Sequence, residues 1–431
     1  MKVSFYTLGC KVNQHETGAM QQLFLDAGYT LAGPEEPADV YVVNSCTVTS
    51  GGDRKSRQWL RRCKRANPNA VTVLTGCMPQ AFPELGIQAV EADIVTGSKG
   101  RKNILKDIQR FCAGEGRIVD ILPHQNGDLF EELPAQQFEE HTRAFVKIED
   151  GCNRFCAYCI IPYARGRVRS RTEESILQEV NALARNGYRE VVLTGINLSC
   201  YGNDTGTDLA DIVEKVAAIP GIQRIRLGSL EPDLLPEDTL RRLSAVDKIC
   251  PQFHLSLQSG CDETLRRMNR HYTTVFYKEL LQKMRGLFPG AQFTTDVIVG
   301  FPGETEEEFA KSLEFVKSCG FLKVHVFTYS ARPGTAAAEM TDQVPQEQRQ
   351  RRHKALAEAA DAVRLEVIAA QEGTMQEILL EKPLSATLFT GYTKGYIPVA
   401  VEAPGSAQGE IVRAALGPYD GARCRCKKAL F

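Results

Sequence analysis

The chain has 431 residues, of which 43% are hydrophobic and 24% are charged, and its formal net charge is −1 at pH 7. This composition is typical of a folded globular protein with two or three domains, and it excludes a disordered or fibrous chain. The near-zero net charge excludes a global attraction to nucleic acid, so an RNA partner would have to meet local basic patches.

The start of the chain and its hydropathy bear on the compartment. The first residues contain no apolar segment of the kind that a signal peptide carries, and no stretch reaches the roughly 18 apolar residues of a membrane span. We therefore expect a cytoplasmic protein with no membrane partner, in which thiols stay reduced. In that compartment fourteen cysteines indicate metal or cluster ligation rather than disulfides.

Residues 1–115 alternate short apolar strands with helical patterns, which predicts a parallel α/β sheet. Loops at the carboxyl ends of parallel strands open on one edge of the sheet, where ligands of such folds bind. Three predicted strands each lead into a cysteine: 2–8 into Cys10, 40–44 into Cys46, and 71–75 into Cys77. We expect these three thiols to converge in space.

Residues 116–141 are acidic and contain Pro123 and Pro134, which predicts a linker. Strand–helix alternation resumes over 142–370, and six β/α units predict a full or partial barrel. Helices are expected at 172–186, at 305–318 with a capping box of Thr305 and Glu308, and at 346–370. The strands are expected at 144–148, 190–194, 224–228, 252–257, 293–299 and 323–329.

The last part of the chain, residues 371–431, changes to short alternating strands broken by glycines. Strands are expected at 376–380, 386–392 and 396–401. A small all-β domain fits this pattern, and a barrel of the oligonucleotide-binding type is the natural candidate.

The strongest motif is a C-x3-C-x2-C run made by Cys152, Cys156 and Cys159 directly after a predicted strand. Three thiolates on one tight loop can hold three irons of a [4Fe–4S] cluster and leave the fourth iron open to another ligand. A zinc site normally recruits a fourth protein ligand and favours C-x2-C pairs, so the spacing argues against zinc.

This loop resembles the cluster-binding loop of the radical S-adenosylmethionine superfamily, in which the cofactor chelates the open iron and yields a 5′-deoxyadenosyl radical on one-electron reduction. Segments 195–197, 227–232, 254–260 and 297–305 follow predicted strands and resemble the superfamily's cofactor-binding motifs. The resemblance implies cofactor contacts from Tyr158, Gly195, Asn197, Ser229, Glu231, Gln258, Ile298 and Gly300.

Over nearly its whole length the chain resembles the tRNA methylthiotransferase family. The resemblance implies a second [4Fe–4S] cluster on Cys10, Cys46 and Cys77, a central partial (β/α)6 barrel, and a C-terminal TRAM barrel that binds RNA. One S-adenosylmethionine would methylate a sulfur held at the auxiliary cluster, and another would generate the radical that activates carbon 2 of an adenine. Implied partners are the tRNA anticodon stem-loop, a one-electron donor such as flavodoxin or ferredoxin, and a sulfur source.

Within the family, segments 7–14 and 44–49 are most similar to the branch that acts on N6-threonylcarbamoyladenosine beside the anticodon. Two alternatives keep the chemistry and change the substrate, to isopentenyladenosine in tRNA or to a ribosomal-protein aspartate. A third is a non-catalytic electron carrier or RNA-binding module, but neither would need six β/α units and two clusters that each lack one ligand.

Basic residues supply the RNA hypothesis. Arg54, Arg57 and Arg61 crowd a helix just beyond Cys46, where they could face tRNA phosphates, or could form a solvated helix face. Arg332 resembles a family position that faces the active site, and we group it with the RNA contacts. The remaining cysteines are interpreted as packing residues, and the roles of Cys424 and Cys426 on a basic tail are left open.

Overall fold

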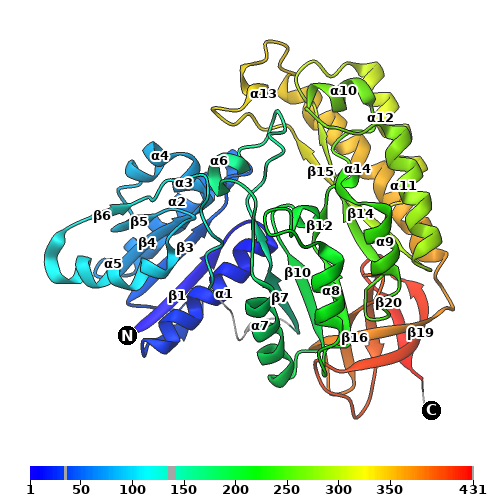
Figure 1. Cartoon of the computed structure of the whole chain (residues 1–431), viewed down its shortest axis with the longest axis horizontal. Coiled ribbons are helices and arrows are strands. Elements are labelled where there is room, and N and C mark those ends of the chain that lie inside the picture. The colour runs from blue at the N-terminus through cyan, green and yellow to red at the C-terminus, as the bar shows by residue number, and fades with distance from the viewer. Residues whose placement is uncertain (34–35, 134–141, 430–431) are drawn as a thin grey trace.

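The computed structural model describes residues 1–33, 36–133 and 142–429, and it contains an N-terminal α/β domain, a central half-barrel and a C-terminal β-barrel (Figure 1). Residues 134–141 of the predicted linker lie outside the described residues. In the described part of the chain, no helix is both long enough and apolar enough to span a membrane.

The N-terminal domain is built on a six-stranded parallel sheet, as the alternating pattern predicts. The strand order is β2-β1-β3-β4-β5-β6. The edge strand β6 falls inside the predicted linker, so the sheet extends further along the chain than the composition suggests. The strands are β1 (Lys2–Thr7), β2 (Thr30–Ala32), β3 (Val40–Ser45), β4 (Val71–Gly76), β5 (Ile94–Thr96) and β6 (Ile118–Asp120).

Helices cover the sheet because its central strands β3 and β4 are buried along their whole length. Phe24 of the first helix packs with Val3 and Val42 in one of the hydrophobic clusters of this domain. The helices are α1 (Lys11–Asp26), α2 (Ser50–Ala66), α3 (Cys77–Ala81), α4 (Pro83–Ile87) and α5 (Ile104–Arg110), with the short turns η1 (Arg101–Asn103) and η2 (Phe111–Glu115).

The central domain confirms the predicted series of parallel strands, which form two adjoining sheets of a half-barrel. A parallel bridge between Ile225 and Ile249 joins the sheets. The first sheet contains β7 (Arg143–Lys147), β10 (Glu190–Thr194) and β11 (Arg224–Leu227). The second contains β12 (Ser229–Leu230), β13 (Gln252–Leu255), β14 (Gln292–Val299) and β15 (Lys323–Thr328), while β8 (Glu149–Asp150) pairs with β9 (Arg169–Ser170).

Helices follow the strands and cover the outside of the half-barrel (Figure 1). The predicted capping box is present, because Thr305 and Glu308 exchange side-chain to backbone hydrogen bonds of 3.1 Å. The helices are α6 (Ile161–Arg165), α7 (Glu173–Arg185), α8 (Leu209–Ala217), α9 (Glu237–Ser244), α10 (Asp262–Arg267), α11 (Thr274–Leu287), α12 (Glu306–Ser318), α13 (Ala336–Glu339) and α14 (Gln346–Ala369), with turns η3 (Leu198–Cys200) and η4 (Pro232–Leu234).

The C-terminal domain is a closed five-stranded barrel, as predicted. Cys424 and Cys426 are buried in its core, which gives them a packing role. The barrel contacts the half-barrel through Arg226, whose guanidinium donates to the Lys394 carbonyl (3.0 Å) and lies over the Tyr396 ring. Its strands are β16 (Met375–Pro383), β17 (Leu388–Thr393), β18 (Pro398–Glu402), β19 (Ile411–Tyr419) and β20 (Cys424–Lys428).

Candidate functional site

The carboxyl edge of the N-terminal sheet brings the first three cysteines together. Cys10, Cys46 and Cys77 directly follow β1, β3 and β4, which are neighbours in the sheet. Gly9 has a left-handed φ of 106°, and a Cβ there would lie 2.7 Å from the Cβ of Cys46 and 2.9 Å from its sulfur. The loops of Cys10 and Cys46 are therefore in contact, and only glycine fits between them.

Two side chains tie these cysteine loops to one another. The Asn13 amide donates to the Leu8 carbonyl (2.6 Å) and to the Ser45 carbonyl (3.0 Å). The Ser45 hydroxyl donates to the Thr75 carbonyl (2.6 Å) and accepts from the Met78 amide (3.2 Å). These contacts fix the three strand ends relative to one another, and motif reading alone does not reveal them.

The second trio lies on one tight loop between β8 and α6. Cys159 donates its backbone amide to the Cys156 carbonyl (2.9 Å), and Phe155 between the first two cysteines has a left-handed φ of 48°. The Cys156 sulfur accepts a hydrogen bond of 3.2 Å from the buried Arg270 guanidinium. The Asn197 amide approaches the Cys152 sulfur at 3.9 Å.

The donor chemistry of both trios fits a metal–sulfur centre. Within the described residues no three candidate ligands are already arranged around a common metal position. Burial raises the pKa of Cys46 and of Cys159 to about 12, and that of Cys152 to about 11. A metal or cluster binds thiolates, so loading either trio would release protons. Three sulfurs in each set suit an iron–sulfur cluster with one open iron.

A cavity of about 180 Å³ lies between Cys159 of the second trio and the loop that follows Cys46 of the first. Val48 and Thr49 line it from the loop that follows Cys46, and Cys159 lines it from the second trio. The rest of its wall comes from the half-barrel and is largely apolar, including Ile160, Ile161, Ile298 and Phe327. A molecule bound here would contact Cys159 and the loop two to three residues beyond Cys46.

Of the residues predicted to contact the cofactor, some line the cavity and others lie outside its wall. Tyr158, Gln258 and Ile298 line the cavity. Asn197 lies beside Cys152, and its backbone amide donates to the buried Glu149 carboxyl at 2.7 Å. Gly195 is required there, because a Cβ would lie 2.5 Å from the same carboxyl oxygen.

Three predicted residues lie elsewhere. Glu231 pairs with Arg270 at 2.5 Å, and Arg270 in turn donates to the Cys156 sulfur. Gly300 packs against the Arg349 side chain, and Ser229 pairs in register with His254. Neither Ser229 nor Gly300 belongs to the cavity wall as the described residues define it.

The predicted RNA-contacting arginines have different environments. Arg57 and Arg61 share the Glu91 carboxylate at 2.9 and 3.3 Å, whereas Arg54 is exposed on the same helix. Arg332 is only 3% exposed. Its guanidinium donates to Thr47 and Asp53 at 2.6 Å and lies over the Phe82 ring, so it fastens the Cys46 loop to the half-barrel.

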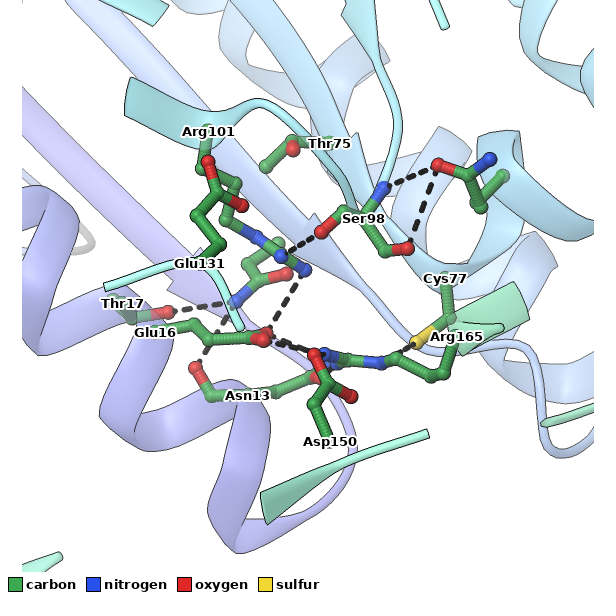
Figure 2. Close-up of polar contacts among 12 residues, drawn as sticks. Asn13, Glu16, Thr17, Thr75, Cys77, Ser98, Arg101, Glu131, Asp150 and Arg165 are labelled. Carbon is green, nitrogen blue, oxygen red and sulfur yellow. Dashed lines mark hydrogen bonds and ion pairs between the residues drawn. The ribbon is translucent and has the colours of Figure 1, made fainter. Parts of the chain in front are cut away.

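A buried polar network joins the two domains beside Cys77 (Figure 2). Arg165, at the end of α6, donates from Nε to the Cys77 sulfur at 3.2 Å and pairs with Glu16 of α1. The sequence places Arg165 in a basic stretch suited to nucleic acid and gives Glu16 no role, so the contact of this pair with a cysteine site comes from the structure alone.

Lys11 opens α1 next to Cys10 and is half-buried at the interior of the half-barrel. Burial, and then the guanidiniums of Arg226 and Arg143, lower the pKa of Lys11 to about 8. The neighbouring carboxylate of Glu190 is already paired with Arg226 at 2.9 Å. Positive charge therefore gathers around the start of this helix.

Two family models match the chain. The radical SAM superfamily matches residues 146–316, and the family described as Uncharacterized protein family UPF0004 matches residues 2–97. The first match covers the second cysteine trio, and the second covers the first trio.

Curated relatives match over almost the full length. The chain is 40% identical to threonylcarbamoyladenosine tRNA methylthiotransferase MtaB of Bacillus subtilis (strain 168), with 95% of this chain and 92% of the relative covered. It is 35% identical to tRNA-2-methylthio-N(6)-dimethylallyladenosine synthase of Pelotomaculum thermopropionicum, with 95% and 94% covered. Among solved structures, the radical S-adenosylmethionine methyltransferase TsrM from Kitasatospora setae has a TM-score of 0.56 at 14% identity, with 78% of this chain and 77% of that chain covered, which shows a shared fold.

Proposed function

The chain belongs to the tRNA methylthiotransferase family of radical S-adenosylmethionine enzymes, and from this premise we propose that it inserts a methylthio group at carbon 2 of N6-threonylcarbamoyladenosine beside the tRNA anticodon. The observation that carries the proposal is the shared cavity, whose wall includes the loop of Cys46 and the loop of Cys159. Sulfur delivery and radical generation must both reach one carbon atom, so the two cysteine sites must share one space.

Two [4Fe–4S] clusters fit the two trios. Cys152, Cys156 and Cys159 would hold the cluster that binds S-adenosylmethionine, and Cys10, Cys46 and Cys77 would hold the auxiliary cluster. When bound, the first cluster and its cofactor supply the 5′-deoxyadenosyl radical, and the auxiliary cluster supplies the sulfur.

The protein's own residues shape and protect this space. Tyr158, Gln258 and Ile298 form one wall of the cavity, and its apolar side chains exclude water from the reacting groups. Arg332 donates hydrogen bonds to Thr47 and Asp53 and so holds the loop after Cys46, which lines another side of the cavity. Its burial supports a structural role at the active site rather than a contact with the RNA surface.

The substrate choice is supported by charge. A threonylcarbamoyl group ends in a carboxylate, whereas the dimethylallyl group named for other relatives is apolar. Lys11 lies next to Cys10, beyond the wall of the cavity, and its neighbours Arg226 and Arg143 pair with Glu190 and Glu381. The ammonium of Lys11 favours a carboxylate over an apolar group. We assign Lys11 the role of binding the substrate carboxylate.

The tRNA is engaged over a wider surface. Arg54 is exposed beyond the Cys46 loop, and the C-terminal barrel carries the exposed basic residues Arg423, Arg425 and Lys427. Phosphate contacts from such residues give affinity without reading the sequence. The barrel would serve as the TRAM domain, with the first domain extended from the expected residue 115 to the end of β6, and with residues 142–370 and 371–431 as the other two domains. A one-electron donor such as flavodoxin or ferredoxin and a separate sulfur source complete the reaction.

Mass spectrometry of tRNA nucleosides tests the proposal. Cells that lack this protein should lose the methylthio form of the threonylcarbamoyl nucleoside and should accumulate its unthiolated precursor. Re-expression of the intact chain should restore the product. Loss of the methylthio isopentenyl nucleoside instead, or of a methylthio group on a ribosomal protein, would assign the alternative substrate.

A further inference from the structure

Each cysteine trio contains one sulfur that accepts a hydrogen bond from a buried arginine. Arg165 donates to Cys77 and Arg270 donates to Cys156, both at 3.2 Å. Arg165 lies six residues beyond Cys159 in the chain, yet it reaches the other trio across the domain junction (Figure 2). The two arginines therefore form a matched pair, one for each site.

The surroundings of Arg165 are strongly positive. Besides Cys77, its guanidinium donates to Asn13 (2.5 Å) and to Glu16 (3.0 Å). Glu16 also accepts a hydrogen bond from Lys147 at 2.8 Å and forms an ion pair with Arg101 at 2.9 Å.

A second carboxylate completes this network. Asp150 lies 2.6 Å from the ammonium of Lys147, 3.4 Å from the guanidinium of Arg169 and 3.6 Å from that of Arg165. Every one of these charged side chains is buried.

The charges of this network do not balance. Four cations (Arg101, Lys147, Arg165 and Arg169) meet two carboxylates (Glu16 and Asp150), which leaves two positive charges in excess. Glu131 accepts the Gly100 amide at 3.2 Å, next to Arg101 in the chain, and counting it still leaves one positive charge unmatched. Glu149 also lies near Lys147 and Arg169, but burial raises the pKa of this carboxyl well above its ordinary value and favours the neutral form, so it is not counted. Unmatched buried charge is strongly unfavourable, so an anion is expected at this place.

The surroundings of Arg270 are balanced. Arg270 pairs with Glu231 at 2.5 Å, and the neighbouring Arg154 pairs with Asp233 at 2.8 Å. This difference matches the ligands expected at the two sites. S-adenosylmethionine that chelates the open iron through its amino and carboxylate groups brings a sulfonium against one carboxylate, so it adds no net negative charge and its site needs no further positive charge. A cubane on three thiolates is an anion, and a sulfur ligand at its open iron would add negative charge.

We propose that Arg165 is a positioning residue of the auxiliary site, which hydrogen-bonds the Cys77 sulfur and, with its surplus positive charge, raises the reduction potential of the cluster held there. Hydrogen bonds to cluster sulfurs and nearby positive charge both favour the reduced, more negative form. Arg270 would give the cluster on the second trio a hydrogen bond to a cysteine sulfur, but its paired surroundings would add no net positive charge. The inference rests on the proposed presence of two clusters.

Redox titration of the full-length, anaerobically reconstituted protein tests this inference by electron paramagnetic resonance. The cluster whose signal changes on addition of S-adenosylmethionine is the one on the second trio, and the other is the auxiliary cluster. Arg165→Gln should shift the auxiliary potential to more negative values and leave the other cluster unchanged. Arg165→Lys, which keeps the charge but loses the Nε donor, should give a smaller shift.

Arg270→Gln is the matched control and should shift only the cluster that responds to S-adenosylmethionine. Arg101→Gln removes one network charge without touching a sulfur, so it tests the charge effect even if Arg165→Gln does not fold. An auxiliary potential that is unchanged in Arg101→Gln, and in whichever Arg165 variant folds, would overturn the inference while both clusters remain present. A single cluster in the unmodified protein would instead contradict the proposed function.

Discussion

The two cysteine trios each present three thiols, but the fold brings the thiols of each trio together in a different way. The second trio lies within eight residues of one loop, so its geometry is local. The first trio is drawn from three neighbouring strands across positions 10–77, and it depends on the sheet and on the Asn13 and Ser45 cross-links. The comparison shows that one loop can bring three thiols together by itself, whereas the first trio depends on the edge of a sheet to do so.

The trios also differ in charge, since the first has a cationic surplus and the second is balanced. The proposed division of labour, with radical generation at the loop and sulfur delivery at the sheet edge, would account for both differences. The following predictions would break or sharpen this comparison.

The largest effect should come from removing one thiol from each trio. Cys156→Ala should abolish formation of 5′-deoxyadenosine, because the loop can no longer hold its cluster. Cys77→Ala should retain that activity and lose methylthio transfer, with iron content reduced by about half because one of two equal clusters is lost. Product analysis by chromatography and iron assay checks both. Loss of 5′-deoxyadenosine formation in both variants would contradict the prediction, because radical generation would then depend on the first trio as well.

A large stability effect is expected at Glu16, which ties the first domain to the half-barrel. Burial alone would raise the pKa of Glu16, but Arg101, Arg165 and Lys147 outweigh it and hold the pKa at about 2, below the ordinary 4.5. Its stabilising effect is therefore complete above about pH 4.5 and is lost as the pH falls toward 2.

Glu16→Gln should lower the free energy of unfolding by about 3–5 kcal/mol at neutral pH, since it leaves buried cations unpaired. Denaturant unfolding measures the change. The surface variant Glu237→Gln, which breaks exposed pairs with Arg241 and Lys283, is the control and should change stability far less, because solvent screens exposed pairs. A loss at Glu16 no larger than in this control would contradict the account of the junction.

A smaller effect on substrate choice is expected at Lys11. Lys11→Gln should weaken binding of an anticodon stem-loop that carries threonylcarbamoyladenosine by about 10- to 100-fold, as for a lost charged hydrogen bond of roughly 1.5–3 kcal/mol. Binding of the same stem-loop with unmodified adenosine should hardly change. Equal losses for both RNAs would show that Lys11 contacts a phosphate instead of the carboxylate.

The smallest effect is expected at Arg54 on the surface. Arg54→Gln should reduce tRNA affinity by roughly two- to fourfold and lower the slope of log affinity against log salt by about 1, as for one lost phosphate contact. Fluorescence anisotropy over a salt series measures both quantities. An unchanged slope would place the RNA on another face of this domain.

Most of the fold and both cysteine trios could be predicted from the sequence, the second trio from its local spacing and the first from the strands that precede its cysteines. Strand β10 lies where the pattern places it, and the cluster loop needs only the spacing of Cys152, Cys156 and Cys159. Strand β6 was missed because it is a three-residue edge strand inside an acidic segment. Strands β19 and β20 were also missed, since their basic, glycine-broken stretch obscures the alternation.

The supporting contacts could not be predicted because their partners are far apart in the chain. Arg165 and Cys77 are separated by 88 residues, and Arg332 and Asp53 by 279. Arg332 was therefore grouped with RNA contacts, although its guanidinium is buried at the domain junction. Glu16 lies in no motif, and the resemblance of segment 7–14 gives Asn13 no role, so only the docking of α1 against the half-barrel shows what they do.

The central claim is that each trio holds one [4Fe–4S] cluster with an open iron. Mössbauer spectroscopy of the anaerobically reconstituted, iron-57-labelled protein tests it most directly. The account predicts about eight irons per chain in two cubanes, one of which responds to S-adenosylmethionine. Zinc in place of iron, or a lone cubane of about four irons, would contradict it.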